Sequence, residues 1–157
     1  MKRGFSLIEL LVVVLIVGIL SAVAVVQYKK AVARFALANL KIVTENIAKS
    51  ARLYYMEYGT YPVSFEALEV PVPISSNKSK RSYNYSWGSC TMIVGFERVE
   101  CAHSNAQIGY YKYYKAKDYR RACVGYSPSA SAVCKQETGR SSATYSNGGT
   151  EEFLYID

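Results

Sequence analysis

The stretch LLVVVLIVGILSAVAVV, from Leu10 to Val26, decides the fold of this chain of 157 residues. It has seventeen residues and no charge, and only Gly18 and Ser21 interrupt its apolar side chains. No second apolar run of this length follows, which argues against a protein that crosses a membrane several times. The gathering of apolar residues at one end also argues against an ordinary soluble enzyme or a fully soluble monomer.

The helical pattern continues beyond the apolar run. From Ala31 to Tyr58 the chain has no Gly or Pro and is rich in helix-forming residues. Gly59 is a natural C-cap for this segment. The sequence predicts one helix from residue 5 to residue 58, about 80 Å long at ~1.5 Å per residue. In its second half one apolar stripe steps by three or four residues, through Val32, Ala36, Leu40, Val43, Ile47, Ala51, Tyr54 and Tyr58.

The remainder of the chain is polar and rich in tyrosine, and it predicts a small head. Strand-like segments are residues 82–86, 90–96, 108–114 and 153–156, and residues 129–136 favour a short helix. Ser64 is suited to begin a further helical turn. The predicted fold class is therefore α+β, with the long N-terminal α-helix packed on a small antiparallel β-sheet head.

Four cysteines lie in the head, at Cys90, Cys101, Cys123 and Cys134. An even number of cysteines after a membrane-targeting segment is typical of disulfides in an oxidising compartment. Four cysteines allow three pairings, and the equal spacing of neighbours favours Cys90 with Cys101 and Cys123 with Cys134. Loops this short stabilise a fold by roughly 2–3 kcal/mol each. A zinc site would need closely spaced ligands such as C-x-x-C, which the sequence lacks.

The residues around the apolar run do not decide whether the N-terminal segment is cleaved or which way it would cross a membrane. Small residues at its end, such as Ser21, Ala22 and Ala24, would permit cleavage as a secretory signal peptide. Lysines or arginines flank the run on both sides, so counting positive charges does not fix its orientation.

Glu9 is the informative residue of the N-terminus. Inserting a carboxylate at membrane depth costs roughly 2.5–3.5 kcal/mol on insertion scales. Such a residue is therefore expected to have a charged partner or a function. The alternative is that Glu9 lies at the boundary of the lipid headgroups, where its carboxylate reaches the polar region without a cost of burial.

The string Lys2-Arg3-Gly4-Phe5-Ser6-Leu7-Ile8-Glu9-Leu10 resembles the N-terminal signature of type IV pilins and related pseudopilins. The pattern is a short basic leader that ends in Gly, then a hydrophobic residue, and a Glu four residues further on. The resemblance reaches about residue 32, and beyond residue 60 it is only architectural, a pilin-like disulfide-bearing head on a long helix.

The resemblance implies that a prepilin peptidase cleaves between Gly4 and Phe5 and methylates the new Phe5 amine. It divides the chain into a leader (1–4), a transmembrane and filament-core helix (5–27), an amphipathic helix half (28–58) and a disulfide-stapled β head (59–157). The precursor would lie in the inner membrane as a single-pass protein. An assembly platform and motor would then build it into an extracellular, homo-oligomeric pilus that serves adhesion, motility or DNA uptake.

Within such a filament Glu9 would be an assembly residue. Its carboxylate can pair with the positive Phe5 amine of a neighbouring subunit, and this pairing offsets the cost of burying either charge alone.

Two alternatives remain at the level of sequence. One is a type II secretion pseudopilin that forms a short periplasmic pseudopilus, although the tail from Ser146 to Glu152 lacks a convincing array of calcium ligands. The other is a minor pilin that binds DNA or another polyanion through its basic, tyrosine-rich segment. The candidate contacts are Lys112, Lys115, Lys117, Arg120 and Arg121.

The alternative is that this segment is a β-strand with a structural role only, and we favour this interpretation over DNA binding. Tyr111 and Tyr113 would then face the core, whereas Tyr110, Lys112 and Tyr114 would face solvent.

The sequence does not favour an enzyme. His103 is the only histidine, and it is expected to be exposed in a loop. No nucleophile-elbow motif or tight Cys/His cluster accompanies it, so we expect no catalytic residue, no metal site and no cofactor.

Overall fold

The computed structural model describes residues 6–68, 81–115 and 120–156 of the chain. It contains a long helix, α1 (Leu7–Tyr58), a 3-10 turn, η1 (Phe65–Ala67), and a second helix, α2 (Pro128–Thr138). Its seven strands are β1 (Ser82–Tyr85), β2 (Gly88–Ile93), β3 (Arg98–His103), β4 (Ile108–Tyr113), β5 (Arg121–Gly125), β6 (Tyr145–Asn147) and β7 (Thr150–Leu154). The predicted α+β class is confirmed.

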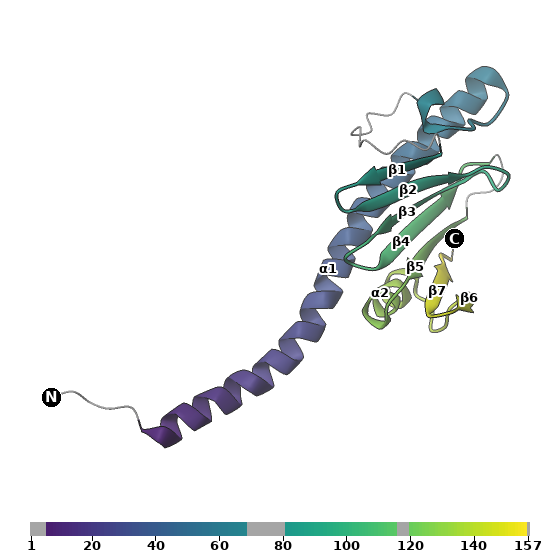
Figure 1. Cartoon of the computed structure of the whole chain (residues 1–157). Coiled ribbons are helices and arrows are strands. Elements are labelled where there is room, and N and C mark those ends of the chain that lie inside the picture. The colour runs from purple at the N-terminus through teal and green to yellow at the C-terminus, as the bar shows by residue number, and fades with distance from the viewer. Residues whose placement is uncertain (1–5, 69–80, 116–119, 157) are drawn as a thin grey trace.

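Both ends of α1 are fixed by local chemistry. At its start Ser6 is extended, and its backbone N–H donates to Glu9 Oε2 at 2.9 Å. At its end Gly59 adopts the left-handed conformation, with φ 71°, and its N–H donates to the Tyr55 carbonyl. Glycine suits this position because it has no Cβ to clash there. Between these points nothing interrupts the helix, and its N-terminal half extends away from the head (Figure 1).

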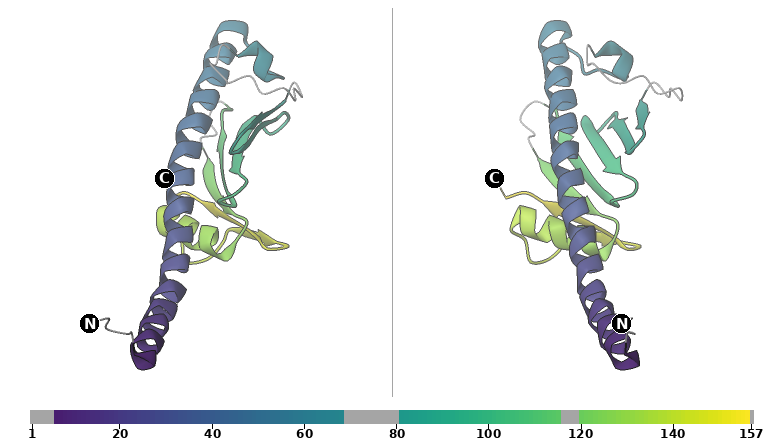
Figure 2. Two further views of the ribbon diagram at one scale, coloured as in Figure 1. Left: turned by 60° about the vertical axis from the view of Figure 1, so that its left-hand side comes forward. Right: turned by 90° about the vertical axis from the view of Figure 1, so that its left-hand side faces the viewer.

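The sheet is antiparallel throughout, in the order β1-β2-β3-β4-β5-β7-β6. The two helices cover one of its faces, as the views in Figure 2 show. The main core lies between them and the sheet. It joins α1 residues such as Leu40 and Ile47 to strand residues such as Val99, Ile108 and Phe153. A smaller cluster around Tyr111 and Val124 lies on the opposite face of the sheet.

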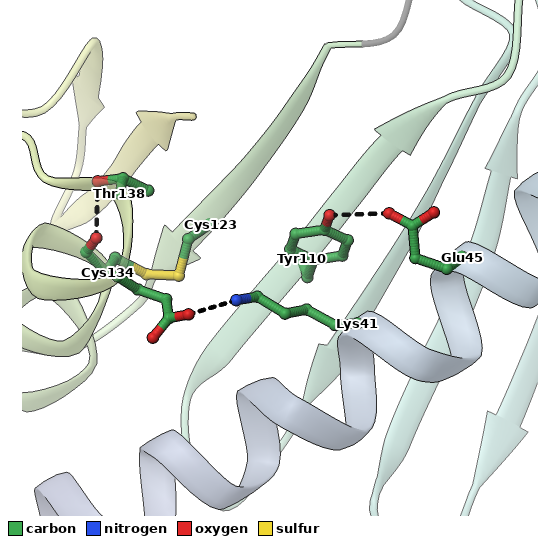
Figure 3. Close-up of polar contacts among 7 residues, drawn as sticks. Lys41, Glu45, Tyr110, Cys123, Cys134 and Thr138 are labelled. Atoms are coloured by element: carbon green, nitrogen blue, oxygen red, sulfur yellow. Dashed lines mark hydrogen bonds and ion pairs between the residues drawn. A yellow bond between two sulfur atoms is a disulfide. The ribbon is translucent and has the colours of Figure 1, made fainter. Parts of the chain in front are cut away.

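The disulfides join Cys90 to Cys101 and Cys123 to Cys134. The first bridges directly opposed residues of β2 and β3, and the second ties α2 to β5 (Figure 3). The same helix approaches β5 closely at Gly125, where an added Cβ would lie only 2.6 Å from the Ser131 backbone nitrogen. The short helix α2 is therefore joined to β5 by a disulfide and packs directly against the backbone of that strand.

Some predicted boundaries were wrong, and three strands were not predicted. The strand expected over residues 90–96 ends at Ile93, because Gly95 and Glu97 adopt positive φ in the turn that follows. The strand expected at 153–156 begins earlier, at Thr150. The missed strands are β3, which carries charged residues, the five-residue β5, and the three-residue polar β6.

Candidate assembly surface

The N-terminal half of α1 has no partner within the described residues. From Leu7 to Val26 its large apolar side chains are between 46% and 89% exposed. By length and composition, α1 is the one helix of the described segments that could cross a membrane. Exposing apolar surface to water costs roughly 25 cal/mol per Å², so this half of α1 is suited to an apolar environment such as a bilayer or a protein interface.

Glu9 is the only acidic residue before Glu45, and it lies exposed in the first turn of α1. Within the described residues, the one hydrogen bond of its carboxylate is the cap from the Ser6 N–H. That contact satisfies a helix-end donor but brings no positive charge to the carboxylate. The predicted processing residues Gly4 and Phe5 lie outside the described residues.

A second apolar stripe continues from the span onto the outer side of the head-bound helix. It consists of Tyr28, Ala31, Phe35, Ala38 and Ile42, and we call it the outer α1 stripe. At 100° per residue these positions lie on the face opposite the buried Ala36, Leu40 and Ile47. Its large side chains are strongly exposed, at 71% for Tyr28, 72% for Phe35 and 62% for Ile42.

This outer α1 stripe was missed in the sequence, where only the head-facing stripe was predicted. The signal was the spacing of three large apolar residues by seven, at positions 28, 35 and 42. The predicted stripe was also too long at its end. Its last member, Tyr58, is 59% exposed.

A groove of about 350 Å³ runs beside the outer α1 stripe. Phe35, Asn39 and Ile42 form its helix side, and Trp87 and His103 form its head side. Trp87 is stacked between Tyr85, at a ring-centroid distance of 4.5 Å, and His103, at 5.9 Å. The groove thus widens the apolar surface from the helix onto the edge of the head.

His103 does not lie in an exposed loop, and that prediction was wrong. It is the last residue of β3 and is half-buried, and its Nδ1 accepts a hydrogen bond from the Ala106 N–H at 3.2 Å. Stacking on Trp87 removes one ring face from solvent.

Comparison with known proteins adds to this geometry. Residues 1–25 match the family model described as the prokaryotic N-terminal methylation motif. The chain is 35% identical over 80 residues to the type IV major pilin protein PilE1 of Neisseria gonorrhoeae, an alignment covering 51% of this chain and 48% of that protein. This chain is type IV pilin-like.

Two further relatives are fimbrial proteins. One, from Neisseria meningitidis serogroup B, is 37% identical over 62 residues, which cover 40% of this chain and 36% of the relative. The other, EcpC of Eikenella corrodens, is 30% identical over 74 residues, 47% of this chain and 48% of the relative. The pilin-like chain thus spans half or less of the length of these curated relatives. No solved structure matches it significantly.

In this pilin-like head the described residues of the basic tyrosine-rich segment do not lie on one surface. Lys112 points to the helix side, where it pairs with Glu45 of α1 and is only 14% exposed. Glu45 also accepts a hydrogen bond from the Tyr110 hydroxyl at 3.2 Å (Figure 3). These two contacts connect β4 to the middle of α1, so Lys112 is engaged within the fold.

The other cations of the segment are spread over both faces of the sheet. Lys115 pairs with Glu97 at 3.5 Å. The guanidinium of Arg120 lies 4.7 Å from the Tyr113 ring on the outer face, and that of Arg121 lies 4.9 Å from the Tyr155 ring on the helix side. Lys117 lies outside the described residues. The described members are therefore divided between two faces of the sheet, and a contact with DNA or another polyanion stays an untested alternative.

The tyrosines of β4, and Tyr114 directly after it, also differ from the prediction. Tyr110 and Tyr114, which were expected to face solvent, are each 1% exposed and pack into the main core. Tyr111 and Tyr113 face the other side of the sheet, where the Arg98 guanidinium lies 4.5 Å from the Tyr111 ring. Side chains cover both faces of β4, because the helices pack on one and an arginine–tyrosine cluster on the other.

Burial changes the acidity of the core tyrosines. It raises the pKa of Tyr110, Tyr111, Tyr126 and Tyr155 far above the ordinary value for a phenol. Burial also raises the pKa of Tyr114 to about 12, with the neighbouring Glu97 contributing. A phenolate is costly in these positions because each would lose its hydration and most would lie beside a carboxylate.

Within the described residues the head offers no site for metal chemistry. No group of three or more His, Cys, Asp or Glu residues lies close enough there to hold a metal ion. The feature that stands out is the exposed apolar surface of α1 and the adjoining edge of the sheet.

Proposed function

We propose that this chain is a structural subunit of a type IV pilus-like filament. The observation that carries the proposal is the exposed apolar surface of α1, which continues past the span onto the outer α1 stripe. The matching relatives support a pilus over a secretion pseudopilus, because their names are those of pilins and fimbrial proteins.

The pathway of the subunit follows from its N-terminus. The precursor spans the inner membrane with residues 5–27 and holds the head outside. A prepilin peptidase removes residues 1–4 and methylates the Phe5 amine, as expected for a chain whose first 25 residues match the methylation motif. The assembly platform and motor then supply the energy that lifts the helix out of the bilayer.

Filament packing replaces lipid with copies of the same helix. Residues 5–27 form the filament core, residues 28–58 join the core to the head, and residues 59–157 form the outer surface. In the core the Glu9 carboxylate pairs with the Phe5 amine of a neighbour, which fixes the axial position of one subunit against the next. The outer α1 stripe beyond Tyr28, and the groove beside it, lie above the bilayer, where other protein subunits can cover them.

A Phe35→Ser substitution tests the role of the outer α1 stripe. We expect about tenfold fewer filaments in the fraction sheared from cells, because burying one phenylalanine is worth about 1.5–3 kcal/mol and ~1.4 kcal/mol is a factor of ten. The midpoint of thermal unfolding should not change, since Phe35 is 72% exposed in the single chain. Electron microscopy and immunoblotting of the sheared fraction give the measurement.

Phe96→Ser is the matched control. Phe96 is 63% exposed and lies in the turn between β2 and β3, away from the outer α1 stripe. Equal filament yields from the two variants would contradict a role of the outer α1 stripe in assembly.

A further inference from the structure

A second cavity lies between α1 and the head, at the end of the head nearest the apolar span. Its volume is about 730 Å³, within the range that holds small ligands. Tyr28 and Lys29 of α1 form one wall. The turn after β3, with Asn105, and the start of α2, with Ser127 and Ser129, form the other.

The lining of this cavity suits an anion. Its polar side chains are hydroxyls, amides, an imidazole and one ammonium group, and none of its residues is acidic. No carboxylate of the described residues forms an ion pair with Lys29. Because His103 Nδ1 accepts the Ala106 N–H, the neutral imidazole carries its proton on Nε2 and retains that atom as a donor.

The N-terminus of α2 is not what makes this cavity suit an anion. The Ser127 hydroxyl already accepts the Ala130 N–H at 3.3 Å, so the helix is capped from within. The positive charge comes from Lys29, and the additional donors come from Ser129 and Asn105 across the cavity.

The position of the cavity along α1, close to the end of the apolar run, indicates that the anion belongs to a membrane lipid. Lys29 follows the last residue of the uncharged run, Val26, by three residues, or about 4.5 Å along a helix. When the span lies in a bilayer, Lys29 and Tyr28 are at the level of the lipid headgroups, where lysine and tyrosine are commonly found. The cavity then opens onto the membrane surface.

We propose that this cavity binds the phosphate of an anionic lipid headgroup through Lys29 and the facing donors of the head, and so holds the head against the membrane before assembly. The proposal rests on the membrane-inserted precursor of the proposed function. It adds a ligand class, a phosphodiester, to a cavity whose lining shares only Tyr28 with the outer α1 stripe. Release of the lipid would accompany the lifting of the subunit into the filament.

Adjacent lysines provide the test. The full chain is reconstituted in phosphatidylcholine nanodiscs with and without phosphatidylglycerol, and native mass spectrometry counts the phosphatidylglycerol retained. We expect Lys29→Gln to reduce phosphatidylglycerol affinity about tenfold, because a hydrogen-bonded charge is lost from the site. Lys30→Gln removes the same charge one residue away, outside the cavity lining, and should change the affinity less than about twofold.

A second variant acts from the opposite wall. Asn105→Asp keeps the size of an exposed side chain but places a carboxylate in the cavity, and it should weaken binding as much as Lys29→Gln does. Equal losses from Lys29→Gln and Lys30→Gln would overturn the proposal, because the attraction would then be general surface charge. Displacement of the lipid by millimolar inorganic phosphate would overturn the assignment to lipid and leave a site for free anions.

The experiment is independent of the filament. It uses single chains in a bilayer, so a failure of lipid binding leaves the assembly proposal intact. Conversely, a chain that binds the lipid but never forms filaments would contradict the proposed function alone.

Discussion

A Glu9→Ala chain is expected to insert into the membrane and to be cleaved after Gly4, yet to yield at least about tenfold fewer filaments than the parent. Removing the carboxylate leaves the Phe5 amine of a neighbour buried in the filament core without its partner. Breaking a buried ion pair in this way costs about 3–5 kcal/mol, enough for more than a factor of ten. The measurement is the ratio of sheared to membrane-bound protein on an immunoblot.

Two further glutamate variants separate charge from helix effects. Glu9→Gln keeps the shape of the side chain and its ability to accept the Ser6 N–H, so it should assemble as poorly as Glu9→Ala if the negative charge is required. Glu66→Gln removes an exposed charge from the head and should assemble normally. Filaments in parental amounts from Glu9→Ala would contradict the pairing of Glu9 with the Phe5 amine.

Alkaline pH is expected to unfold the head cooperatively. Because the folded state raises the pKa of the five core tyrosines, it holds their phenols protonated where the unfolded chain, with phenol pKa values near ~10, ionises. The stability that these groups contribute is fully present below pH ~10 and is lost as the pH rises toward the folded pKa values, the lowest being that of Tyr114 at about 12. Each unit of difference corresponds to about 1.4 kcal/mol.

The measurement follows phenolate absorbance and circular dichroism of the full chain in detergent as the pH is raised. We expect most of the core phenolate signal to appear together with the loss of β structure. Tyr114→Phe removes one ionisable group whose hydroxyl has no hydrogen-bond partner in the described residues, so its unfolding midpoint should move to higher pH. Ionisation of all tyrosines near pH ~10 with the fold intact would contradict the account.

The parts of this fold that sequence could predict are those set by local chemistry. A helix without Gly or Pro, ended by Gly59, needs no tertiary information, and its limits were predicted to within two residues. The α2 helix was predicted over residues 129–136, and it is slightly longer because Ser127 caps its start, Pro128 suits its first turn and Gly139 ends it. The α+β class followed from these helices and the strand-like segments of the head.

The missed strands depend on tertiary contacts. β3 carries Arg98 and Glu100, which pair with each other at 3.4 Å on the outer face, and such charges conceal a strand in the sequence. The burial of Tyr110 and Tyr114 was likewise not predictable, because strand alternation gives two faces but not which of them a helix will cover. In β4 both faces are covered.

The candidate site was predictable to different degrees. Glu9 was recognisable because a carboxylate in an apolar run is rare and requires a reason. The outer α1 stripe was present in the sequence as a repeat of seven but was concealed by the stronger head-facing pattern. The groove at Trp87 and the cavity at Lys29 bring together residues far apart in the chain, so only the folded structure could reveal them.

The most direct test of the central claim is mass spectrometry of protein sheared from the cell surface, which identifies the N-terminal peptide and measures the mass of the intact chain with and without reduction. We predict a chain that begins at N-methylated Phe5 and gains the mass of four hydrogens on reduction of its two disulfides. Such a chain keeps its apolar span and can build a filament core. A chain that still begins at Met1, or one cleaved after Val26, would contradict the account, since the first keeps its leader and the second has lost the helix on which assembly depends.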